Sequence, residues 1–590
     1  MTENIGGMGA IITDTGVAFR VWAPNATSVS VKGEFNDWSE DANPLGTEFN
    51  GFWYGFVEGA QVGQQYKFHL TNGENGFDRM DPYARQVTNS VGNAVIYDHA
   101  AYDWEGDSFV CPPHNELVIY ETHVGSFTSG EGVGTFEGLT GSLDHLQELG
   151  INAVQLMPVA EFAGDHSWGY NPAHIFAVET AYGGPDALKD FVKECHRRGI
   201  AVIMDVVYNH LGPSDLDLWT FDGWSENGLG GIYFYNDDRA HTPWGSTRPN
   251  YGTGEVRQFL HDNALSWLRD FHVNGLRYDM IPYIRSASGT GFDLPEGWSM
   301  MRWINVDVRQ EFPRAITIAE DMHGHASVTS TADDGASFHA QWDALFVHPV
   351  REVLETPDDA NRSMAELRDA IGSSYGDTYS RVIYTESHDE VANGRARVPE
   401  EIEPGNATGW AAQKRSTLGA GIMLASPGIP MLFQGQEFLE GGWFRDDVPL
   451  DWSKAENFQG IARLYRDLIR LRRNWFDTTK GLSGHGLNVF HTHENAKVIA
   501  WQRWAEHGAG DDVVIVANLS HEARDNYRIG FPSYGLWKLR FSSDATIYSS
   551  LFGDHDSFDA DATGAGQDGL EHSATVNVAP YSMLIFSQDR

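Results

Sequence analysis

Arg277 and Asp279 stand two residues apart in a short apolar segment, Gly275–Met280. In a β-strand, residues i and i+2 point to the same face, so this segment would present a cation and a carboxylate together at its end. An arginine close to an aspartate holds the carboxylate ionised, and an ionised carboxylate can act as a nucleophile. Taken alone, the pair is equally consistent with a structural ion pair at a strand end.

Other apolar segments of the chain also end in ionisable residues. They are Asp205 with the following Asn209 and His210, Glu320 with Asp321, and Glu386 with the following His388, Asp389 and Glu390. No cysteine and no His-Glu-x-x-His spacing accompanies them, so no metal site is predicted here. Cleavage of a glycosidic bond needs two carboxyl groups, one to protonate the departing oxygen and one to attack or to guide water. These segments therefore predict glycoside chemistry.

Strand-like segments alternate with helical patterns from residue 117 onward. The helical patterns have apolar stripes at 139–149, 185–198 and 260–271. The strand-like segments are 117–121, 153–158, 201–205, 275–280, 316–320, 343–346, 381–384 and 429–433. Eight apolar strands in a repeating βα pattern predict a parallel (β/α)8 TIM barrel, in which the C-terminal ends of the strands build the active site.

Period-two alternation of apolar and polar residues flanks this central region on both sides. It predicts an α/β protein with an N-terminal β-sandwich at 1–110, a catalytic barrel at 111–475 and a C-terminal β-sandwich at 476–590. The stretch at 211–257 is too long for a plain loop, so we expect it to be an inserted subdomain that helps to build the substrate site.

The charge of the chain restricts its partners. Among 590 residues, 82 are acidic and 41 are basic, which gives a formal net charge of −41. Such a surface repels phosphate backbones and anionic lipids, so neither nucleic acid nor a membrane is an expected partner. The substrate should be neutral or cationic, and 19 tryptophans suit a sugar binder. The alternative reading of the charge is a solvated acidic surface, as in proteins adapted to salt.

The cysteines and apolar segments indicate the compartment. Only Cys111 and Cys195 are present, so a disulfide framework is not expected. Residues 1–7 show no signal-peptide pattern, and the longest apolar stretch, 418–433, is too short to span a bilayer and contains two prolines. The sequence predicts a cytoplasmic protein.

The polar strand ends resemble, in order and in spacing, the family-defining regions of the α-amylase superfamily, and the likeness covers essentially the whole chain. The resemblance implies Asp279 as nucleophile, Glu320 as general acid/base and Asp389 as the carboxylate that holds sugar hydroxyls. It implies that Arg277 keeps Asp279 ionised and that Asp205 supports the site. The implied sugar contacts are Tyr170, His210 and His388. His123 is left between a sugar contact and a structural role.

The superfamily that the chain resembles retains anomeric configuration, which implies a double displacement. Asp279 would attack the sugar C1 while Glu320, protonated because its pKa is raised, donates to the leaving oxygen. An acceptor activated by Glu320 would then resolve the glucosyl-aspartate. Retention implies that the two carboxyl groups lie roughly 5–5.5 Å apart.

The acceptor distinguishes two readings. Ser387–Val391 is similar to the Ser-His-Asp-Glu-Val of branching enzymes, and 434–452 looks like their eighth-strand segment. These likenesses imply a 1,4-α-glucan branching enzyme, a glycosyltransferase that moves a cut α-1,4 chain to a glucan 6-hydroxyl. By contrast, Asn209 departs from the branching-enzyme pattern and looks more like α-amylases and maltooligosyltrehalose trehalohydrolases. A retaining hydrolase is therefore the alternative, and a non-catalytic glucan-binding protein on the same barrel is the reading from another class.

The N-terminal part and the cofactors follow from the same likeness. Gly33–Trp38 resembles the signature of carbohydrate-binding modules that precede branching and debranching enzymes, and the Trp38 ring is more typical of a core side chain than of a sugar platform. The expected partner is an α-glucan, such as amylose, glycogen or a maltooligosaccharide. No cofactor is expected. In amylases the residue matching Asn209 is associated with calcium, which leaves a structural calcium ion open without support elsewhere in the sequence.

Overall fold

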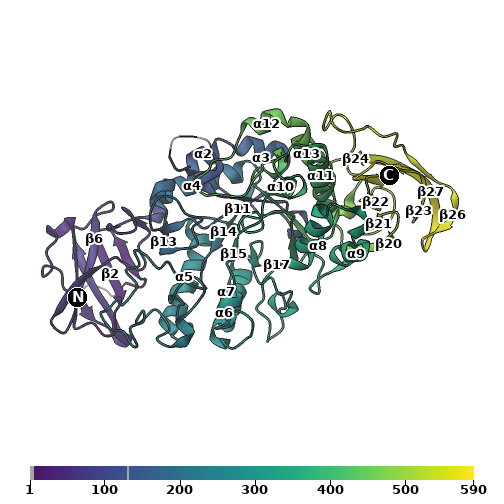
Figure 1. The fold of residues 1–590 in the computed structure, drawn as a ribbon. Helices are drawn as coiled ribbons and strands as arrows, with labels where there is room; N and C mark the ends of the chain where they lie inside the picture. Colours follow the sequence, from purple (N-terminus) through teal and green to yellow (C-terminus); the bar gives the residue numbers. More distant parts are fainter. Residues whose placement is uncertain (1–4, 129, 131) are drawn as a thin grey trace.

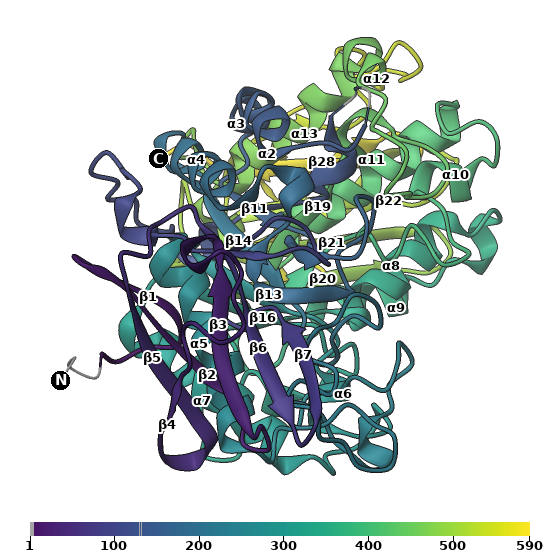
Figure 2. The same cartoon turned by 90° about the vertical axis from the view of Figure 1, so that its left-hand side faces the viewer.

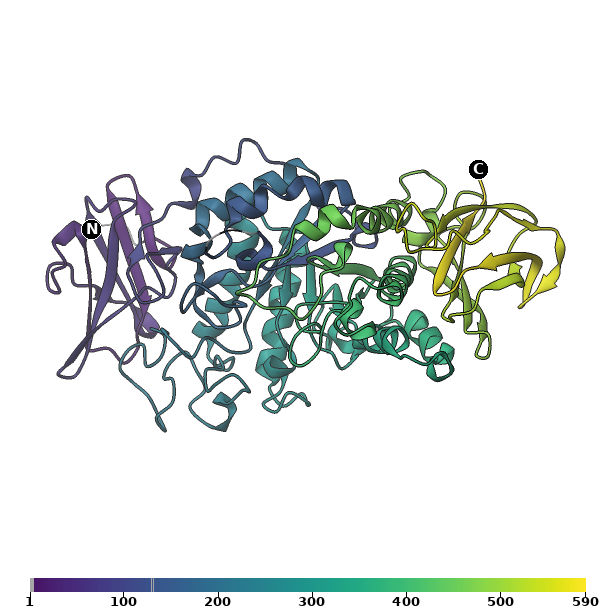
Figure 3. The same ribbon diagram turned by 45° about the horizontal axis from the view of Figure 1, so that its top comes forward.

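The computed structural model describes residues 5–128, 130 and 132–590, and it is elongated. A β-sandwich lies at the N-terminal end, a barrel in the middle and a second β-sandwich at the C-terminal end (Figures 1 and 3). Residues 1–4, which belong to the first predicted domain and to the segment without a signal-peptide pattern, lie outside the described residues. No helix among the described residues is long and apolar enough to cross a membrane.

Two antiparallel sheets form the N-terminal sandwich, which Figure 2 brings to the front. One contains β1 (Gly9–Thr13), β2 (Gly16–Trp22), β5 (Phe52–Glu58) and β4 (Gly46–Thr47); the other contains β3 (Ser28–Gly33), β6 (Gln65–Asn72), β7 (Asn75–Arg79), β8 (Gln86–Val87) and β9 (Ala94–Val95). Their apolar faces meet around the rings of Phe19, Tyr66 and Phe68. Trp38 lies outside this core and is half-buried, so its interpretation as a core residue was wrong. Positive φ angles of 52° at Asp37 and 59° at Trp38 turn the chain away there.

Within the described residues, eight parallel strands close into the predicted barrel. They are β10 (Ile119–Thr122), β11 (Ala153–Leu156), β14 (Ala201–Val206), β15 (Gly275–Tyr278), β16 (Ile316–Ala319), β17 (Ala340–Trp342), β18 (Arg381–Ile383) and β19 (Ile429–Phe433). The side chains of these strands are buried, which explains why their sequences read as short apolar runs. A separate antiparallel pair, β12 (Ala160–Phe162) and β13 (Pro172–Val178), follows β11.

The sixth barrel strand was predicted at the wrong place. Residues 343–346 begin helix α8 (Ala344–Glu355) instead, and the strand is β17, just before it. The side chain of Asp343 accepts a hydrogen bond from the backbone N–H of Leu345 at 3.0 Å and so caps the helix. A strand of three residues carries almost no periodicity, whereas the following apolar residues are in helical spacing.

Helices surround the barrel (Figures 1 and 2). They are α1 (Val124–Phe127), α2 (Phe136–Thr140), α3 (Leu143–Leu149), α4 (Gly184–Arg197), α5 (Gly254–Asp270), α6 (Pro282–Arg285), α7 (Pro295–Glu311), α8, α9 (Met364–Gly372), α10 (Val398–Ile402), α11 (Trp410–Ala425), α12 (Ser453–Asn457) and α13 (Gln459–Arg472). The helical pattern at 139–149 is split between α2 and α3 at Gly141 and Ser142. The patterns at 185–198 and 260–271 correspond to α4 and the C-terminal part of α5.

The segment at 211–257 connects the barrel with the N-terminal sandwich. Asp222 Oδ2 accepts from the backbone N–H of Asn25 at 2.8 Å, and Asp217 Oδ2 accepts from that of Met80 at 2.6 Å. The rings of Trp22 and Tyr233 pack edge to face at 5.5 Å. The inserted segment is therefore fixed at its outer side, which keeps its inner side in place beside the barrel.

A second sandwich follows α13. One sheet contains β20 (Gly486–His493), β21 (Val498–Trp504), β22 (Val513–Asn518), β28 (Ser582–Ser587), β24 (Gly535–Ser542) and β25 (Ala560–Ala562); the other contains β23 (Arg524–Phe531), β27 (Leu570–Val578) and β26 (Gly564–Gln567). The sandwich packs on α11, where Trp501 donates its indole N–H to the carbonyl of Ala425 at 3.2 Å. Beside it, Lys414 Nζ of α11 lies 2.5 Å from Asp544 Oδ1, and both side chains are buried.

We expect Lys414→Met to destabilise the contact between the barrel and the C-terminal sandwich. The substitution keeps the length of the side chain but leaves the Asp544 carboxylate buried without its cation, which costs about 3–5 kcal/mol in the free energy of unfolding. Thermal unfolding followed by circular dichroism measures the change. The control is Arg445→Ala, which removes an ion pair with Asp447 at the surface and should leave the midpoint unchanged. Equal midpoints for both variants would contradict the prediction.

Candidate active site

A single guanidinium group joins three carboxylates at the C-terminal ends of neighbouring strands. Arg277, in β15, is fully buried. Its Nη1 donates to Asp205 Oδ2 at 2.8 Å and to Asp279 Oδ1 at 3.0 Å, and its Nη2 donates to Glu320 Oε2 at 2.7 Å. Asp205 and Arg277 are direct partners in the barrel register, which accounts for their contact. Charge-assisted hydrogen bonds of this length fix the relative positions of all four groups.

Asp279 follows β15 directly and has a hydrogen-bond donor on each carboxylate oxygen. Arg277 donates to Oδ1, and the side-chain amide of Asn209 donates to Oδ2 at 2.6 Å. The same amide donates to the backbone carbonyl of Asp279 at 2.9 Å. The carboxylate is 6% exposed and is held in one orientation, as an attacking group requires.

Glu320 follows β16 and has two unequal oxygens. Its Oε2 accepts from Arg277 and from the backbone N–H of Met280 at 2.9 Å. No hydrogen bond reaches Oε1 from any residue that the structure describes, which leaves this oxygen to carry a proton. Burial raises the pKa of Glu320, the Arg277 charge opposes this shift and the Asp279 charge adds to it. The group is thus suited to act as a general acid.

His388 is held by a carboxylate that the sequence analysis did not single out. Glu121, at the end of β10, accepts from His388 Nδ1 at 2.7 Å and from the backbone N–H of His388 at 2.9 Å. Burial disfavours the charged imidazole, but Glu121 outweighs it and the pKa of His388 rises to about 9. The ring stacks on Tyr170 at 5.1 Å between centroids. At neutral pH, His388 is therefore an imidazolium with Nε2 left to donate.

Asp389 lies beside His388 in the segment after β18, and its side chain is exposed. Its Oδ1 accepts from Asn393 Nδ2 at 2.9 Å, and among the described residues it makes no hydrogen bond to the carboxylates around Arg277. Desolvation by the surrounding walls raises its pKa, the charge of His388 lowers it and that of Glu320 raises it. Asp389 is accessible to a substrate at the rim of the barrel.

Tyr170 and Asp205 form the floor beneath Arg277. The Tyr170 hydroxyl donates to Asp205 Oδ2 at 2.8 Å. Burial raises the pKa of Asp205 to about 7, Arg277 opposes this shift and Asp279 adds to it. The ring of Trp342, at the end of β17, lies 4.3 Å from the guanidinium carbon of Arg277. Together these contacts keep water away from the inner side of the guanidinium.

His210 closes the site on the side of the inserted segment. Its Nδ1 contacts Asn209 Oδ1, and burial lowers its pKa to about 4, so the ring is neutral at pH 7. The ring of Trp244 stacks on it at 4.8 Å. His123, by contrast, uses both ring nitrogens: Nε2 donates to the carbonyl of Ser167 at 2.8 Å and Nδ1 accepts from the Ser126 hydroxyl at 2.9 Å. This bonding favours the structural role for His123.

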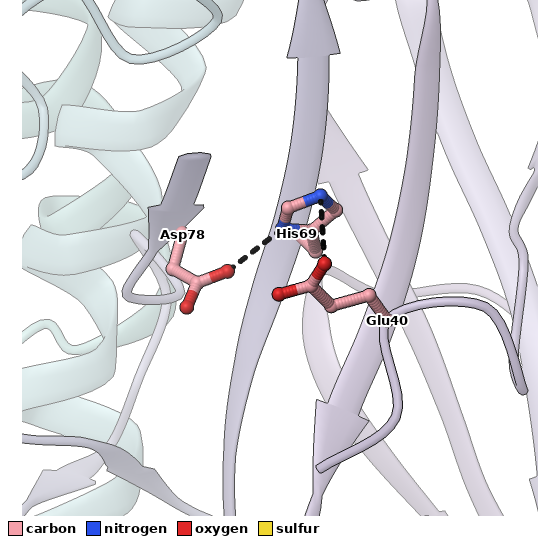
Figure 4. A group of neighbouring side chains, drawn as sticks. All are labelled: Glu40, His69 and Asp78. Carbon is pink, nitrogen blue, oxygen red and sulfur yellow. Dashed lines mark hydrogen bonds and ion pairs between the residues drawn. The ribbon is translucent and has the colours of Figure 1, made fainter. Parts of the chain in front are cut away.

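Among the residues that the structure describes, one group of side chains has the spacing of a metal site, and it lies in the N-terminal sandwich. Glu40, His69 and Asp78 point toward one another in Figure 4. His69 Nδ1 lies 2.8 Å from Asp78 Oδ1 and Nε2 lies 3.7 Å from Glu40 Oε2. However, Lys32 Nζ lies 3.0 Å from an oxygen of each carboxylate, so an ammonium group already balances their charge. We interpret the group as an ion-pair network.

The structure brings seven of the eight predicted site residues into one connected group, and the eighth, Asp389, follows His388 in the chain. The connected residues are Tyr170, Asp205, His210, Arg277, Asp279, Glu320 and His388. Glu121 was missed, although it stands at the C-terminal end of a barrel strand like the carboxylates that were found. Trp342 was missed because its strand was misplaced. Asn209 was considered for calcium, whereas in the structure it contacts Asp279 and His210.

Three family models match parts of the chain. They are the alpha amylase catalytic domain at 121–226, carbohydrate-binding module 48 (isoamylase N-terminal domain) at 7–84 and the alpha amylase C-terminal all-beta domain at 490–589.

Relatives are similar to the chain over nearly its whole length. The 1,4-alpha-glucan branching enzyme GlgB of Salinibacter ruber is 31% identical over an alignment of 622 positions, gaps included. The alignment covers 99% of this chain and 96% of that protein. GlgB of Corynebacterium jeikeium is 30% identical over an alignment of 610 positions, which covers 98% of this chain and 83% of that protein. Among solved structures, pullulanase from Paenibacillus barengoltzii superposes with a TM-score of 0.75 at 20% identity, covering 100% of this chain and 96% of that one. The last likeness shows the fold.

The contact between Glu121 and His388 predicts a pH-dependent loss of stability in Glu121→Gln. The unfolded-state pKa of histidine is about 6.5, so the folded protein binds more protons than the unfolded chain between about pH 6.5 and 9. The stabilisation is therefore complete below pH 6.5 and is lost as the pH rises through 9. We expect the variant to be about 2–3 kcal/mol less stable than the wild type at pH 6 and to approach it at pH 9.5.

Denaturant unfolding at several pH values measures this difference. Glu352→Gln, on the exposed side of α8, is the matched control because no hydrogen bond to its side chain is found in the described part of the chain. A difference between Glu121→Gln and the wild type that stays constant from pH 6 to 9.5 would show that His388 does not hold the extra proton.

Proposed function

The chain belongs to the GlgB family of 1,4-alpha-glucan branching enzymes within the α-amylase superfamily, and we propose that the site around Arg277 carries out this reaction by a retaining double displacement. The enzyme cuts an α-1,4-glucan chain and transfers the cut piece to a glucan 6-hydroxyl, which forms an α-1,6 branch. The contacts around Arg277 support a specific division of roles, in which Asp279 is the nucleophile and Glu320 the general acid/base.

The first displacement forms a bond between Asp279 and the sugar. One Asp279 oxygen attacks C1 as the α-1,4 bond breaks, and Glu320 transfers its Oε1 proton to the departing 4-oxygen. The second displacement reverses these roles. Glu320 removes the proton of the incoming 6-hydroxyl, whose oxygen attacks C1 and displaces Asp279. Two inversions leave the anomeric configuration as it was, and Glu320 recovers its proton.

The observation that carries this proposal is the shared guanidinium. Asp279 Oδ1 and Glu320 Oε2 accept from the two terminal nitrogens of Arg277, at 3.0 and 2.7 Å. The two carboxyl groups therefore stand side by side. Glu320 Oε1 has no hydrogen bond to any described residue, and Asp279 Oδ2 is oriented by the side-chain amide of Asn209. The separation of roughly 5–5.5 Å stays a prediction.

The remaining site residues are proposed to bind the sugar that reacts. His388, as an imidazolium, donates to a sugar hydroxyl, and the adjacent Asp389 accepts from another. Tyr170 lies under the ring, and His210 contacts the sugar from the side of the inserted segment. Asp205 holds Arg277 and the Tyr170 hydroxyl in place and does not itself touch the substrate.

The finer features of the enzyme follow as further parts of the proposal. The substrates are amylose, glycogen and maltooligosaccharides, and the N-terminal part (1–110) binds the same glucans outside the catalytic barrel (111–475). The third part, 476–590, stabilises the barrel through α11. We propose a cytoplasmic location, which free, buried Cys111 and Cys195 support.

A paired assay on amylose tests the reaction. New α-1,6 linkages are counted by proton NMR, and new reducing ends are counted in the same sample. A branching transferase forms linkages while reducing ends stay nearly constant. A rise in reducing ends without α-1,6 linkages would overturn the proposal in favour of a retaining hydrolase, the reading that Asn209 suggested from the sequence.

Two substitutions separate the nucleophile from the acid/base. Asp279→Asn should lower turnover of amylose by about 10⁵-fold because no covalent intermediate forms. Glu320→Gln should lower it by about 10²–10⁴-fold because the leaving oxygen is no longer protonated. With α-maltosyl fluoride, whose leaving group needs little protonation, Glu320→Gln should still form the covalent intermediate.

Intact-mass spectrometry reads this difference directly. We expect a maltosyl adduct on the Glu320→Gln variant and none on Asp279→Asn. An adduct on Asp279→Asn, or none on either variant while both remain folded, would show that the roles are assigned wrongly.

A further inference from the structure

Trp244, in the inserted segment, presents part of its ring to solvent beside the catalytic group. The ring stacks on His210 with 4.8 Å between centroids and 16° between planes, yet 40% of the residue is exposed. The imidazole covers one face of the indole, and the rest of the residue, including the other face and the ring edges, supplies the exposed part. The indole N–H donates no hydrogen bond to any described residue.

Backbone contacts hold the turn that carries this ring. Trp244 lies in a tight turn in which Thr242 and Gly245 form a β-bridge. The Thr242 hydroxyl accepts from the backbone N–H of Trp244 at 3.2 Å. Arg248 Nη2 then donates to the carbonyls of His241 at 2.9 Å and Ala287 at 2.8 Å, which joins the turn to the segment after β15. The turn that carries the ring is therefore held by its own bridge and by the segment after β15.

A second aromatic ring links Trp244 to Glu320. Tyr283 packs against Trp244 edge to face at 5.2 Å. The backbone N–H of Tyr283 donates to the carbonyl of Met280 at 3.0 Å, and the N–H of Met280 donates to Glu320 Oε2 at 2.9 Å. The two rings are thus linked to Glu320 through Met280, while Trp244 is also linked to Asp279 through His210 and Asn209, so the rings lie next to both carboxyl groups.

Glu320 defines the acceptor side. In a double displacement the acid/base protonates the departing glucan and later removes the proton of the incoming hydroxyl, so both glucans bind next to it. A glucan that is to compete with water at this position needs a surface that holds it. Aromatic rings supply apolar area with a fixed orientation, and the indole N–H and the Tyr283 hydroxyl, for which the described residues offer no partner, can bond to sugar hydroxyls.

We propose that Trp244, together with Tyr283, is the platform on which the acceptor glucan stacks, and that it determines whether a glucan 6-hydroxyl or water resolves the intermediate. This inference rests on the proposed branching function and adds the acceptor site to it. The platform places a glucan hydroxyl beside Glu320 and excludes water from the same space. The competing explanation is that Trp244 only holds His210 in place.

The two explanations differ in what Trp244→Ala changes. Loss of a platform should lower the ratio of new α-1,6 linkages to new reducing ends by about five- to tenfold, whether or not total α-1,4 cleavage also falls, because the departing glucan binds on the same side. A higher concentration of glucan should restore part of the ratio, because stacking strengthens the binding of the acceptor that competes with water. Loss of support for His210 alone would lower total cleavage and leave the ratio unchanged.

The experiment uses the full chain and the paired amylose assay on four proteins: the wild type, Trp244→Ala, Trp244→Phe and Trp475→Ala. Trp244→Phe retains a ring and should keep a ratio close to that of the wild type. Trp475, on the loop after α13, is 47% exposed and serves as the matched control for removing a surface indole.

Each outcome has one meaning. A lowered ratio in Trp244→Ala, retained in Trp244→Phe and in Trp475→Ala, supports the platform. An unchanged ratio in Trp244→Ala overturns it, whatever happens to total cleavage. If the wild type itself forms no α-1,6 linkages, the proposed branching function fails, and the acceptor platform that rests on it fails too; the wild-type sample alone reveals this case.

Discussion

The chemistry of this protein depends on one buried guanidinium shared by three carboxylates. Removing a charge from water is costly unless it is paired, and Arg277 is fully buried. Asp205, Asp279 and Glu320 cannot all be ionised around one positive charge without leaving negative charge uncompensated in a site of low dielectric constant. Protons are therefore favoured on the members whose pKa values burial raises, Glu320 among them. Burial and the neighbouring Asp279 charge thus favour a proton on Glu320, against the opposing charge of Arg277.

The register of neighbouring barrel strands, rather than the course of the loops, brings Arg277 and the carboxylates together. Asp205 and Arg277 are direct partners across β14 and β15, and Arg277 is the partner of Ile318 in β16. Asp279 lies two residues after Arg277, and Glu320 lies two residues after Ile318, so each carboxylate is on the same face of its strand as the residue two positions before it. Parallel strands place all these ends at one rim. The inserted segment, fixed to the N-terminal sandwich at its outer side, then adds the ring of Trp244 to this rim.

Sequence reasoning was accurate where several constraints agreed. The segment with Arg277 and Asp279 combined an apolar run, a bounding glycine and polar residues at its end, and the structure has Gly275–Tyr278 as β15 with Asp279 directly after it. It failed at the sixth strand, because three residues have no readable period while Asp343 begins a helix. Glu121 could have been found by applying the strand-end rule to the first strand. The stacking of Trp244 on His210 could not have been predicted, because it depends on how an irregular segment folds back over the barrel.

Electrostatics connects the site with the composition of the whole chain. The transition state of glycosyl transfer resembles an oxocarbenium ion, whose positive charge spreads over C1 and the ring oxygen. Around it the protein places more carboxylate than cationic groups: Glu121 is paired with the imidazolium of His388 and Arg277 is shared, which leaves Asp279 and Asp389 toward the sugar. A fixed negative potential stabilises developing positive charge without reorganisation of solvent. A formal net charge of −41 does not disfavour a neutral glucan, although it would repel an anionic substrate. The acidic chain is thus compatible with its reaction. The glucan is neutral when it binds and becomes positively charged only in the transition state, where the carboxylates of the site stabilise it.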